Sequence, residues 1–585
     1  MPARDRPRSK TMRKPYIWLI RCVTTAVCYV AAASSAFAKE HTETQVANLV
    51  IQLTPKKNAE NQSTGLRVSY TLVQAPENAV VPLTLRLDTL EPALTRTSDQ
   101  VADLHASDAR GAVEFSEPVR QQSNGKTFQV WKASRPTYGV LHVSYVVPVA
   151  LPHPPIRGPH IDLQAAGGGV SGALVSVLLL PPLSGHIRAA LKWHMSKDER
   201  AVSTFAYGNS SVTTTMDELN STLFLAGRLE TFPSKPPTKG FSMYSLGCAP
   251  GALRRSASWY EKAYEAMRQA FHPRSDSAFR VLIRSYDGGP LDSGRANNGS
   301  LLLYLPLNVD PGSPAEHSLI AHEMVHVFTR PLDGDSNGEG DWYTEGIADY
   351  LKITVPFAAG LYSRAEYLGL INSQAAFYYT NPDRDLSVPD AAKAKWKGNV
   401  SWTIPYARGS MYFANLDAEL RAKGQSVIGL INEMNHKMAD GEPSNDQTWL
   451  RLLETRLGQQ AVAEWTDMWR GHLMRPVTGA FGGSLETQPV NTGYFSLGYL
   501  PAYHTEGSVI QKVLPGTNAA SAGLIAGDSL AETVDINPLA HSFASQIRLR
   551  IERHGKLLVV TFDPHTKEQV PAWEWRNAKD DQRIH

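Results

Sequence analysis

The sequence predicts a multidomain protein with an all-β N-terminal domain, an α+β middle domain that continues into a helical extension, and a compact C-terminal β unit. Three observations support this prediction. The chain has 585 residues, more than one hydrophobic core accommodates. Apolar residues recur with period two before about residue 246 and with helical spacing after residue 250. A connector rich in Gly, Ser and Thr, residues 478–492, then precedes the last unit.

Composition places the chain among ordinary globular proteins. Hydrophobic residues make up 42% of the sequence and charged residues 19%, with a formal net charge of +2. These values differ from those of disordered chains and of proteins with many membrane spans. Beyond the first few residues there is no dense Lys/Arg stripe interleaved with aromatic residues. We therefore expect no nucleic-acid partner.

Residues 1–38 have the features of a secretory signal peptide. A basic stretch from Arg4 to Lys14 precedes an apolar run, residues 16–33, and small residues follow at Ala36 and Ala38. This order predicts export, cleavage after Ala38 and no integral membrane span in the mature protein. The alternative is a retained membrane anchor, which Arg21 inside the apolar run disfavours.

The cysteines indicate the compartment. Cys22 and Cys28 lie within the predicted signal, which leaves Cys248 alone in the mature protein. A single cysteine excludes an internal disulfide. An exported protein of this size without disulfides favours a bacterial periplasm.

Strand signals fill residues 39–246, the predicted N-terminal β domain. Residues 49–53, 66–72 and 140–147 alternate in polarity or are rich in β-branched side chains, and Pro, Gly, Asn or Asp separate such runs. The stretch Gly167-Gly168-Gly169 lacks the Lys-Ser/Thr pair of a nucleotide-binding loop. It therefore predicts a turn or bulge.

Residues 247–476 combine both periodicities and form the predicted α+β domain with its helical extension. Residues 256–271 have the spacing of an amphipathic helix, and residues 279–284 that of a short strand. Further helices are expected at 315–329, 342–353, 364–377, 409–423 and 449–473. The connector and the C-terminal unit occupy residues 477–585.

A metal-binding pattern lies within the helix expected at 315–329. In His322-Glu323-Met324-Val325-His326 the two histidines are four residues apart, so both project from one helical face. Their imidazoles could hold one Zn²⁺, with Glu323 directed at the open coordination position. This short pattern also occurs by chance, and most isolated histidines on helices are structural. The prediction of a zinc site therefore requires a further ligand elsewhere in the sequence.

Glu345 is the third predicted ligand. Eighteen residues separate it from His326, so a second helix packed beside the first can complete a His₂Glu set that leaves one position for water. Asp349 lies one turn further along the same face and is expected to accept the free ring N–H of His322 or His326. The alternative is that Glu345 caps a helix and Asp349 is solvated.

These residues predict hydrolysis by a zinc-activated water. Glu323 would take the proton of that water and later deliver it to the leaving amine. An oxyanion donor is also required, and our candidate is Tyr406, which lies at the start of a helix about sixty residues beyond Glu345. The alternative is that Tyr406 or Tyr412 packs in the core.

Together these motifs resemble the glycyl aminopeptidase family of gluzincins, which are distant relatives of aminopeptidase N. The resemblance rests on HExxH, on Tyr343-Thr344-Glu345-Gly346 at gluzincin spacing, and on Pro405-Tyr406-Ala407-Arg408-Gly409, which is similar to the family's Tyr-x-Lys-Gly with arginine in place of lysine. It implies a β domain, a thermolysin-like α+β zincin catalytic domain and a C-terminal PDZ domain. It also implies that Tyr406 stabilises the transition state.

Residues 508–528 resemble the strand, Pro-Gly turn, short helix and Ala-Gly-Leu-x-x-Gly-Asp run of a PDZ domain, a small β-sandwich or barrel, and residues 557–562 would supply its closing strand. The candidate peptide-binding loop is Leu497, Gly498, Tyr499 and Leu500, whose backbone N–H groups would receive the C-terminus of a peptide ligand. The alternative is that this module only packs against the catalytic domain.

One departure from the family concerns the substrate. Related aminopeptidases hold the free α-amine of the substrate with a glutamate, and the corresponding stretch here, residues 288–300, has none. Gly288, Gly289 and Asp292 are the substrate-binding candidates, whereas Arg295 would oppose an amine. The prediction is an exported zinc metallopeptidase acting on peptides or proteins, with aminopeptidase action leading. The alternatives are a thermolysin-like endopeptidase and a weakly catalytic periplasmic scaffold that binds peptides or proteins.

Overall fold

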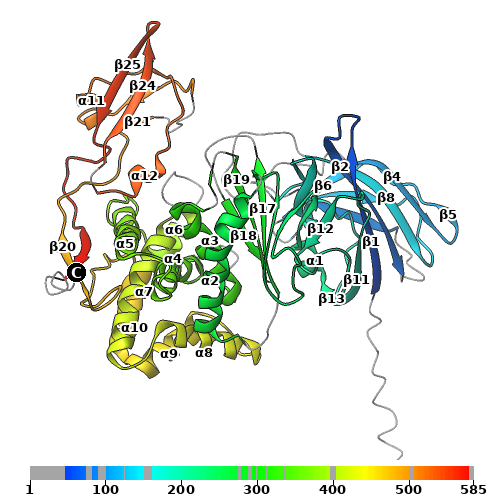
Figure 1. The fold of residues 1–585 in the computed structure, drawn as a ribbon, viewed down its shortest axis with the longest axis horizontal. Coiled ribbons are helices and arrows are strands. Elements are labelled where there is room, and N and C mark those ends of the chain that lie inside the picture. Colours follow the sequence, from blue (N-terminus) through cyan, green and yellow to red (C-terminus); the bar gives the residue numbers. More distant parts are fainter. Residues whose placement is uncertain are drawn as a thin grey trace, which may run out of the picture. The chain divides into compact units, whose positions relative to one another are not determined.

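The structure is a computed structural model (Figure 1). It describes residues 47–73, 82–89, 101–123, 126–149, 161–249, 251–273, 278–286, 293–297, 299–307, 309–310, 312–333, 338–394, 403–500, 506–543 and 545–578. The predicted signal and the substrate-binding candidates Gly288, Gly289 and Asp292 lie outside the described residues. The chain divides into Met1–Val46 and the compact unit Ala47–His585, to which all elements below belong. Within the described residues, none of the helices has the length and apolar character needed to cross a membrane.

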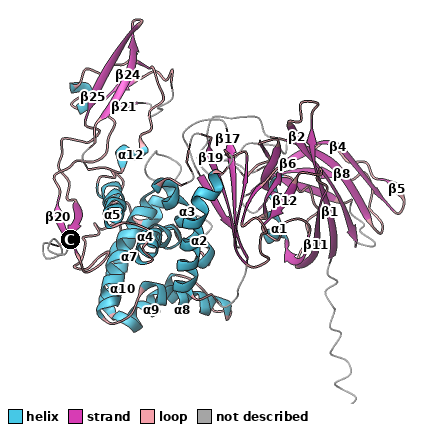
Figure 2. Cartoon of the chain, in the orientation of Figure 1, coloured by secondary structure: helices cyan, strands magenta, loops and turns pink. Residues whose placement is uncertain are grey.

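The N-terminal part is built from β-sheets, as Figure 2 shows. Its largest sheet has the order β13 (Ser210–Thr215), β11 (His186–Trp193), β1 (Ala47–Lys57), β2 (Ser63–Val73), β8 (Leu141–Pro148), β4 (Ala102–Asp108), β5 (Gly111–Ala112). A three-stranded sheet contains β3 (Thr84–Asp88), β7 (Lys126–Lys132) and β6 (Val119–Ser123), and a four-stranded sheet contains β12 (Arg200–Ser203), β14 (Leu223–Gly227), β10 (Gly169–Ala173) and β9 (Gln164–Ala166). One short helix, α1 (Met216–Asn220), lies between β13 and β14.

Alternating burial explains why these residues form sheets. Leu49, Ile51 and Leu53 of β1 are fully buried in one core with every second residue of β2, so the period-two pattern marks one face of the sheet. The predicted turn at the glycine stretch joins β9 to β10, where Gly167 and Gly168 have φ of 49° and 73°. Such positive φ values favour glycine.

A five-stranded mixed sheet follows along the chain. Its order is β15 (Glu230–Phe232), β16 (Gly240–Leu246), β17 (Ala278–Tyr286), β19 (Ser300–Pro306), β18 (Ser293–Asn297). Strands β16, β17 and β19 are parallel, and β18 runs antiparallel to β19 at the edge of this sheet. Two helices, α2 (Ala252–Phe271) and α3 (Pro314–Phe328), share a core with the sheet.

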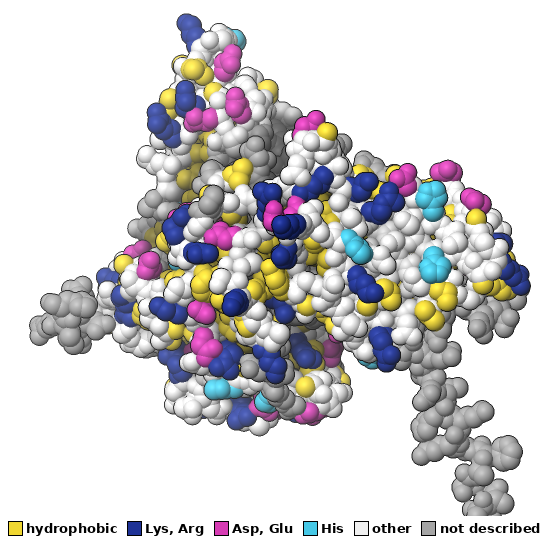
Figure 3. Space-filling model, turned by 45° about the vertical axis from the view of Figure 1, so that its right-hand side comes forward, with side chains coloured by type: hydrophobic (Ala, Val, Ile, Leu, Met, Phe, Trp, Pro, Cys, Tyr) yellow, Lys and Arg dark blue, Asp and Glu magenta, His cyan; other side chains and the backbone are white. Residues whose placement is uncertain are grey.

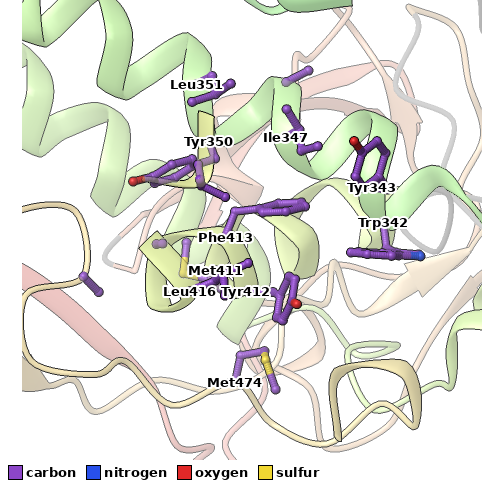
Figure 4. Close-up of a cluster of buried hydrophobic side chains, with 14 of the residues drawn as sticks. Trp342, Tyr343, Ile347, Tyr350, Leu351, Met411, Tyr412, Phe413, Leu416 and Met474 are labelled. Carbon is purple, nitrogen blue, oxygen red and sulfur yellow. The ribbon is translucent and has the colours of Figure 1, made fainter. Parts of the chain in front are cut away.

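The next part of the chain is helical. It comprises α4 (Asp341–Ala358), α5 (Arg364–Tyr379), α6 (Val388–Ala394), α7 (Ile404–Ala422), α8 (Val427–Ala439), α9 (Asp446–Leu457) and α10 (Gln459–Trp469). Aromatic side chains of α4 and α7 fill its core: Trp342 and Tyr343 pack against Phe413 (Figure 4). On the face shown in Figure 3, basic and acidic side chains are interspersed.

The structure corrects two helix predictions and adds two helices. The single helix expected at 449–473 is two helices, α9 and α10, because the chain turns at Gly458, where φ is 93°. The helix expected at 409–423 already begins at Ile404, since Pro405 is tolerated in a first helical turn. Helices α6 and α8 were not predicted.

The C-terminal unit consists of short strands around a small core. They are β21 (Tyr499–Leu500) paired with β22 (Lys512–Val513), and β23 (Ser529–Leu530), β24 (Ile547–Arg553) and β25 (Lys556–Phe562) in one sheet, with α11 (Asn518–Ser521) and α12 (Asn537–Ala540). Flanking this unit, β20 (Leu485–Pro489) pairs with β26 (Trp573–Asn577). The chain therefore enters and leaves the unit at adjacent positions. The prediction of a β-rich N-terminal region followed by a helical part is confirmed.

Candidate metal centre

Helix α3 presents the two predicted histidine ligands. Its N-terminus is capped by Ser313, whose Oγ accepts a hydrogen bond from the N–H of Glu316, and Pro314 occupies the first turn. Ile320 and Met324 are fully buried against the mixed sheet. The helix is thereby fixed with His322 and His326, four residues apart, directed at α4.

The structure brings His322, His326 and Glu345 together. Nε2 of His322 lies 3.2 Å from Nε2 of His326 and 3.2 Å from Oε2 of Glu345. Nε2 of His326 lies 3.3 Å from the same carboxylate oxygen. Among the described residues, this is the one group of three or more His, Cys, Asp or Glu side chains with ligand atoms close enough to share a metal ion.

This triangle has the dimensions of one face of a zinc coordination tetrahedron. With metal–ligand bonds of about 2.0–2.1 Å, the edges of a regular tetrahedron measure about 3.3–3.4 Å. Nδ1 of His322 lies 2.9 Å from Oδ1 of Asp349, so we assign the ring proton to Nδ1. The Nε2 lone pair of His322 then faces Nε2 of His326 and an oxygen of Glu345, three atoms that can all bind one cation. The three side chains therefore fit one zinc ion and leave its fourth position open.

Asp349 is held by three donors. Besides His322, Lys352 Nζ lies 2.5 Å from its Oδ1 and Gln374 Nε2 lies 2.7 Å from its Oδ2. The carboxylate is buried, so these bonds fix its orientation and, through it, the His322 ring. Sequence reasoning missed Lys352 and Gln374. Lys352 follows Asp349 by three residues, so helical spacing could have predicted their contact. No local pattern indicates Gln374, which lies on α5.

The electrostatics of this cluster favour positive charge. Burial lowers the pKa of His322, but its hydrogen bonds to Asp349 and Glu345 outweigh burial and raise that pKa to about 9. Burial raises the pKa of Glu345, and the two histidines outweigh it and hold that pKa well below its usual range. Both pKa shifts arise because anionic oxygens lie close to the imidazoles. A divalent cation bound between them would stabilise the same negative charge.

Tyr406 lies beside the proposed ligands. Its ring stacks against that of His322 with centroids 5.8 Å apart and planes inclined by 13°. Burial, followed by the carboxylates of Glu345 and Asp341, raises the pKa of Tyr406 well above its usual value. The phenol therefore stays protonated and can donate a hydrogen bond. Tyr412, by contrast, is buried in the helical core, where the indole N–H of Trp449 donates to its Oη at 3.3 Å.

Two glycines set the approach of the helices that carry Glu345 and Tyr406. A Cβ added to Gly346 on α4 would lie 2.5 Å from Cα of Gly409 on α7, and one added to Gly409 would lie 2.3 Å from the carbonyl oxygen of Trp342. Real Cβ atoms do not come so close to backbone. The two helices can therefore cross at this distance only because both positions are glycine.

The predicted peptide-binding loop belongs to the C-terminal unit and is not part of the metal centre. Leu497 and Tyr499 are buried in the core of that unit, whereas Leu500 is 47% exposed. Gly498 has φ of 73°, and its carbonyl accepts a hydrogen bond from the N–H of Leu514. The described residues thus place this segment at the pairing of β21 with β22.

Comparison with known proteins concerns the fold. No protein-family model matches the sequence, and no curated protein matches it. Among solved structures, an aminopeptidase N family protein from Idiomarina loihiensis matches with a TM-score of 0.67 at 15% identity, over 91% of this chain and 99% of that chain. An M1 zinc metallopeptidase from Deinococcus radiodurans has a TM-score of 0.44 at 16% identity over 74% and 95% of the two chains. Leukotriene A4 hydrolase from Saccharomyces cerevisiae has a TM-score of 0.44 at 14% identity over 74% and 68%.

The first match shows that almost the whole of this chain shares its fold with an aminopeptidase N family protein. The other two similarities are too low to support an argument. Assignment of the chemistry therefore rests on the residues of this chain.

Proposed function

We propose that this chain is an exported zinc metallopeptidase that hydrolyses peptide bonds. The observation that carries the proposal is the triangle of His322 Nε2, His326 Nε2 and Glu345 Oε2, with edges of 3.2, 3.2 and 3.3 Å. These edges match a tetrahedral zinc site with one open position, which is the arrangement of catalytic rather than structural zinc. The shared fold with an aminopeptidase N family protein is consistent with this proposal.

The proposed reaction is attack of water on a peptide carbonyl. Zinc, when bound, would polarise that carbonyl and lower the pKa of water. Glu323 follows His322 directly on α3, is buried, and accepts the proton of the attacking water before passing it to the leaving amine. Tyr406 donates its phenolic hydrogen to the oxygen on which negative charge develops. The raised pKa of Tyr406 keeps that hydrogen in place at neutral pH.

The leading specificity is that of an aminopeptidase, and one observation is compatible with both this specificity and the endopeptidase alternative. Strand β18 lies beside α3 and forms the edge of the mixed sheet. An edge strand next to the reacting centre can bind an extended peptide through backbone hydrogen bonds. Such binding does not require a free amino terminus, so it serves either specificity.

Two measurements test the reaction. Metal analysis of the purified protein is expected to give one zinc per chain, and a chelator is expected to abolish hydrolysis of a peptide library. Glu323→Gln should retain zinc and lose turnover, while the matched change Glu261→Gln on the exposed surface of α2 should retain both. Zinc without Glu323-dependent turnover would favour the scaffold alternative and contradict the enzyme proposal.

The substrate end is tested separately. We expect peptides with a free amino terminus to be cleaved and their N-acetylated forms to resist cleavage. Mass spectrometry of the products gives the cleaved bond directly. Equal cleavage of both forms, at internal bonds, would replace the aminopeptidase assignment by that of a thermolysin-like endopeptidase.

The proposal also includes export of the chain and, separately, ligand binding by its C-terminal unit. The signal-like residues 1–38 support secretion across the inner membrane into a bacterial periplasm. Residues 477–585 are proposed to contain a PDZ-like module that binds a peptide C-terminus through residues 497–500. Cell fractionation with N-terminal sequencing tests the first point, and titration of the protein with C-terminal peptides tests the second.

A further inference from the structure

Helix α5 lies between the C-terminal unit and the metal centre. From the C-terminal unit, the ring of His541 stacks on Phe377 of α5, with centroids 4.1 Å apart and planes inclined by 10°. Nδ1 of His541 lies 3.1 Å from Oγ of Ser373. Phe377 also packs against the apolar core of the C-terminal unit. The unit therefore contacts α5 through both apolar and polar groups.

The paired strands that flank the C-terminal unit hold the same helix. Asn372 of α5 donates a hydrogen bond to the carbonyl of Trp575 at 2.9 Å and accepts one from its N–H at 2.7 Å. At the first residue of α5, Nε of Arg364 donates a hydrogen bond to Oδ1 of Asn577 at 2.7 Å. These contacts, together with those of His541, extend along α5 from its first to its fourth turn.

On its other side α5 supports the metal centre. Gln374 directly follows Ser373, is buried, and donates to Asp349 at 2.7 Å. Asp349 in turn holds the ring of His322. A displacement of α5 would move Gln374 and thereby the carboxylate that orients a metal ligand.

We propose that His541 is a positioning residue of the zinc centre, which acts from the C-terminal unit by fixing α5 and, through Gln374 and Asp349, the orientation of His322. The inference rests on the proposed zinc site. It assigns the C-terminal unit a part in building that site, in addition to any ligand of its own. Burial, followed by the nearby Lys352, lowers the pKa of His541 to about 4, so the docked ring is uncharged at neutral pH.

Zinc affinity of the full chain tests the inference. Metal-free protein is titrated with Zn²⁺ in competition with a chromophoric chelator, a readout that does not require turnover. We expect His541→Ala to weaken zinc binding by about threefold or more, in the range of couplings transmitted through packed elements. We expect His541→Phe, which preserves stacking on Phe377 but loses the contact with Ser373, to have a smaller effect.

A matched control separates positioning from general damage to the C-terminal unit. Thr517 caps α11 within the same unit, where its Oγ1 accepts from the N–H of Ala520. Thr517→Ala should therefore loosen the unit without touching α5 and leave zinc affinity unchanged. If Thr517→Ala weakens zinc binding as much as His541→Ala, the assignment of His541 as a positioning residue is wrong.

A double-mutant cycle tests the route. Gln374→Met removes the donor to Asp349 and retains the volume of the side chain. In the Gln374→Met background, His541→Ala is expected to have no additional effect on zinc affinity. Full additivity of the two changes, or wild-type affinity of the His541→Ala protein, would overturn the inference. If the protein binds zinc as expected but shows no Glu323-dependent turnover, the proposed peptidase activity is contradicted, whereas the effect of His541 on zinc affinity is still tested.

Discussion

Replacing Gly409 with alanine perturbs the crossing of α4 and α7. The added Cβ would lie 2.3 Å from the carbonyl oxygen of Trp342 and 2.6 Å from Cα of Gly346. Ordinary contacts between such atoms are about 3.5 Å, so the helices must separate by about 1 Å. Overpacking of this kind costs about 1–3 kcal/mol, and the better helix propensity of alanine offsets about 1 kcal/mol of that cost.

The same displacement moves Tyr406, three residues before Gly409, away from His322. A misplacement of about 1 Å in a catalytic group can lower the rate about 100-fold. We therefore expect Gly409→Ala to lose at most about 2 kcal/mol in the free energy of unfolding and to lose about two orders of magnitude in kcat. Urea unfolding followed by circular dichroism gives the first value, and hydrolysis of a peptide found by library digestion gives the second.

Gly369 provides the control, because it lies inside α5 and a Cβ added there meets no atom within 4 Å. Gly369→Ala is expected to raise the free energy of unfolding by about 0.5–1 kcal/mol and to leave kcat unchanged. If Gly409→Ala unfolds at the wild-type urea concentration and hydrolyses peptide at the wild-type rate, the reasoning about the helix crossing is refuted.

Four further predictions concern the metal, its neighbours and one partly buried ion pair. Removal of zinc by a chelator should lower the thermal midpoint, because a metal bound only by the folded chain stabilises it by about 2.7 kcal/mol at a 100-fold excess over Kd; restoring zinc should reverse the shift. Asp349→Asn removes the anionic partner of His322 and should weaken zinc binding about 10- to 100-fold in a chelator competition; unchanged affinity would contradict the assignment. Tyr406→Phe should lower kcat about 100-fold at unchanged zinc affinity, and a parallel loss of affinity would indicate a structural role. Hydrogen bonds from Arg135 hold the pKa of Asp108 below its usual range, so Asp108 stabilises the fold fully above about pH 4 and progressively less as pH falls toward its folded pKa. Asp108→Asn should accordingly cost more unfolding free energy at pH 7 than at pH 3, and an equal cost would count against the ion pair.

Local periodicity predicted most of the secondary structure. The buried alternation in β1 and β2 and the apolar spacing in α3, α4 and α5 are properties of short segments, so the sequence alone reveals them. The boundary at Gly458 was missed because apolar spacing continues on both sides of it. A glycine inside a helical pattern is compatible with either one helix or two, and only its positive φ decides.

The candidate site was predictable as far as its residues are close in sequence. His322 and His326 share one helical turn, and the distance to Glu345 along the chain matches a known pattern. Gln374 and His541 could not be inferred in this way. Their contacts join α5 to α4 and to the C-terminal unit, and no local pattern links residues 25 and 168 positions apart.

The glycines in the two motifs have a physical explanation that the sequence resemblance does not supply. Glu345 and Tyr406 lie on different helices. Glu345 directly precedes Gly346 and Tyr406 lies three residues before Gly409, the two glycines at which those helices touch. Close contact of the two backbones brings both the carboxylate from α4 and the phenol from α7 next to His322. A larger residue at either glycine would separate the proposed metal ligand from the proposed oxyanion donor while both side chains remained present. The proposed chemistry therefore depends on two residues without side chains as much as on those that would contact the substrate.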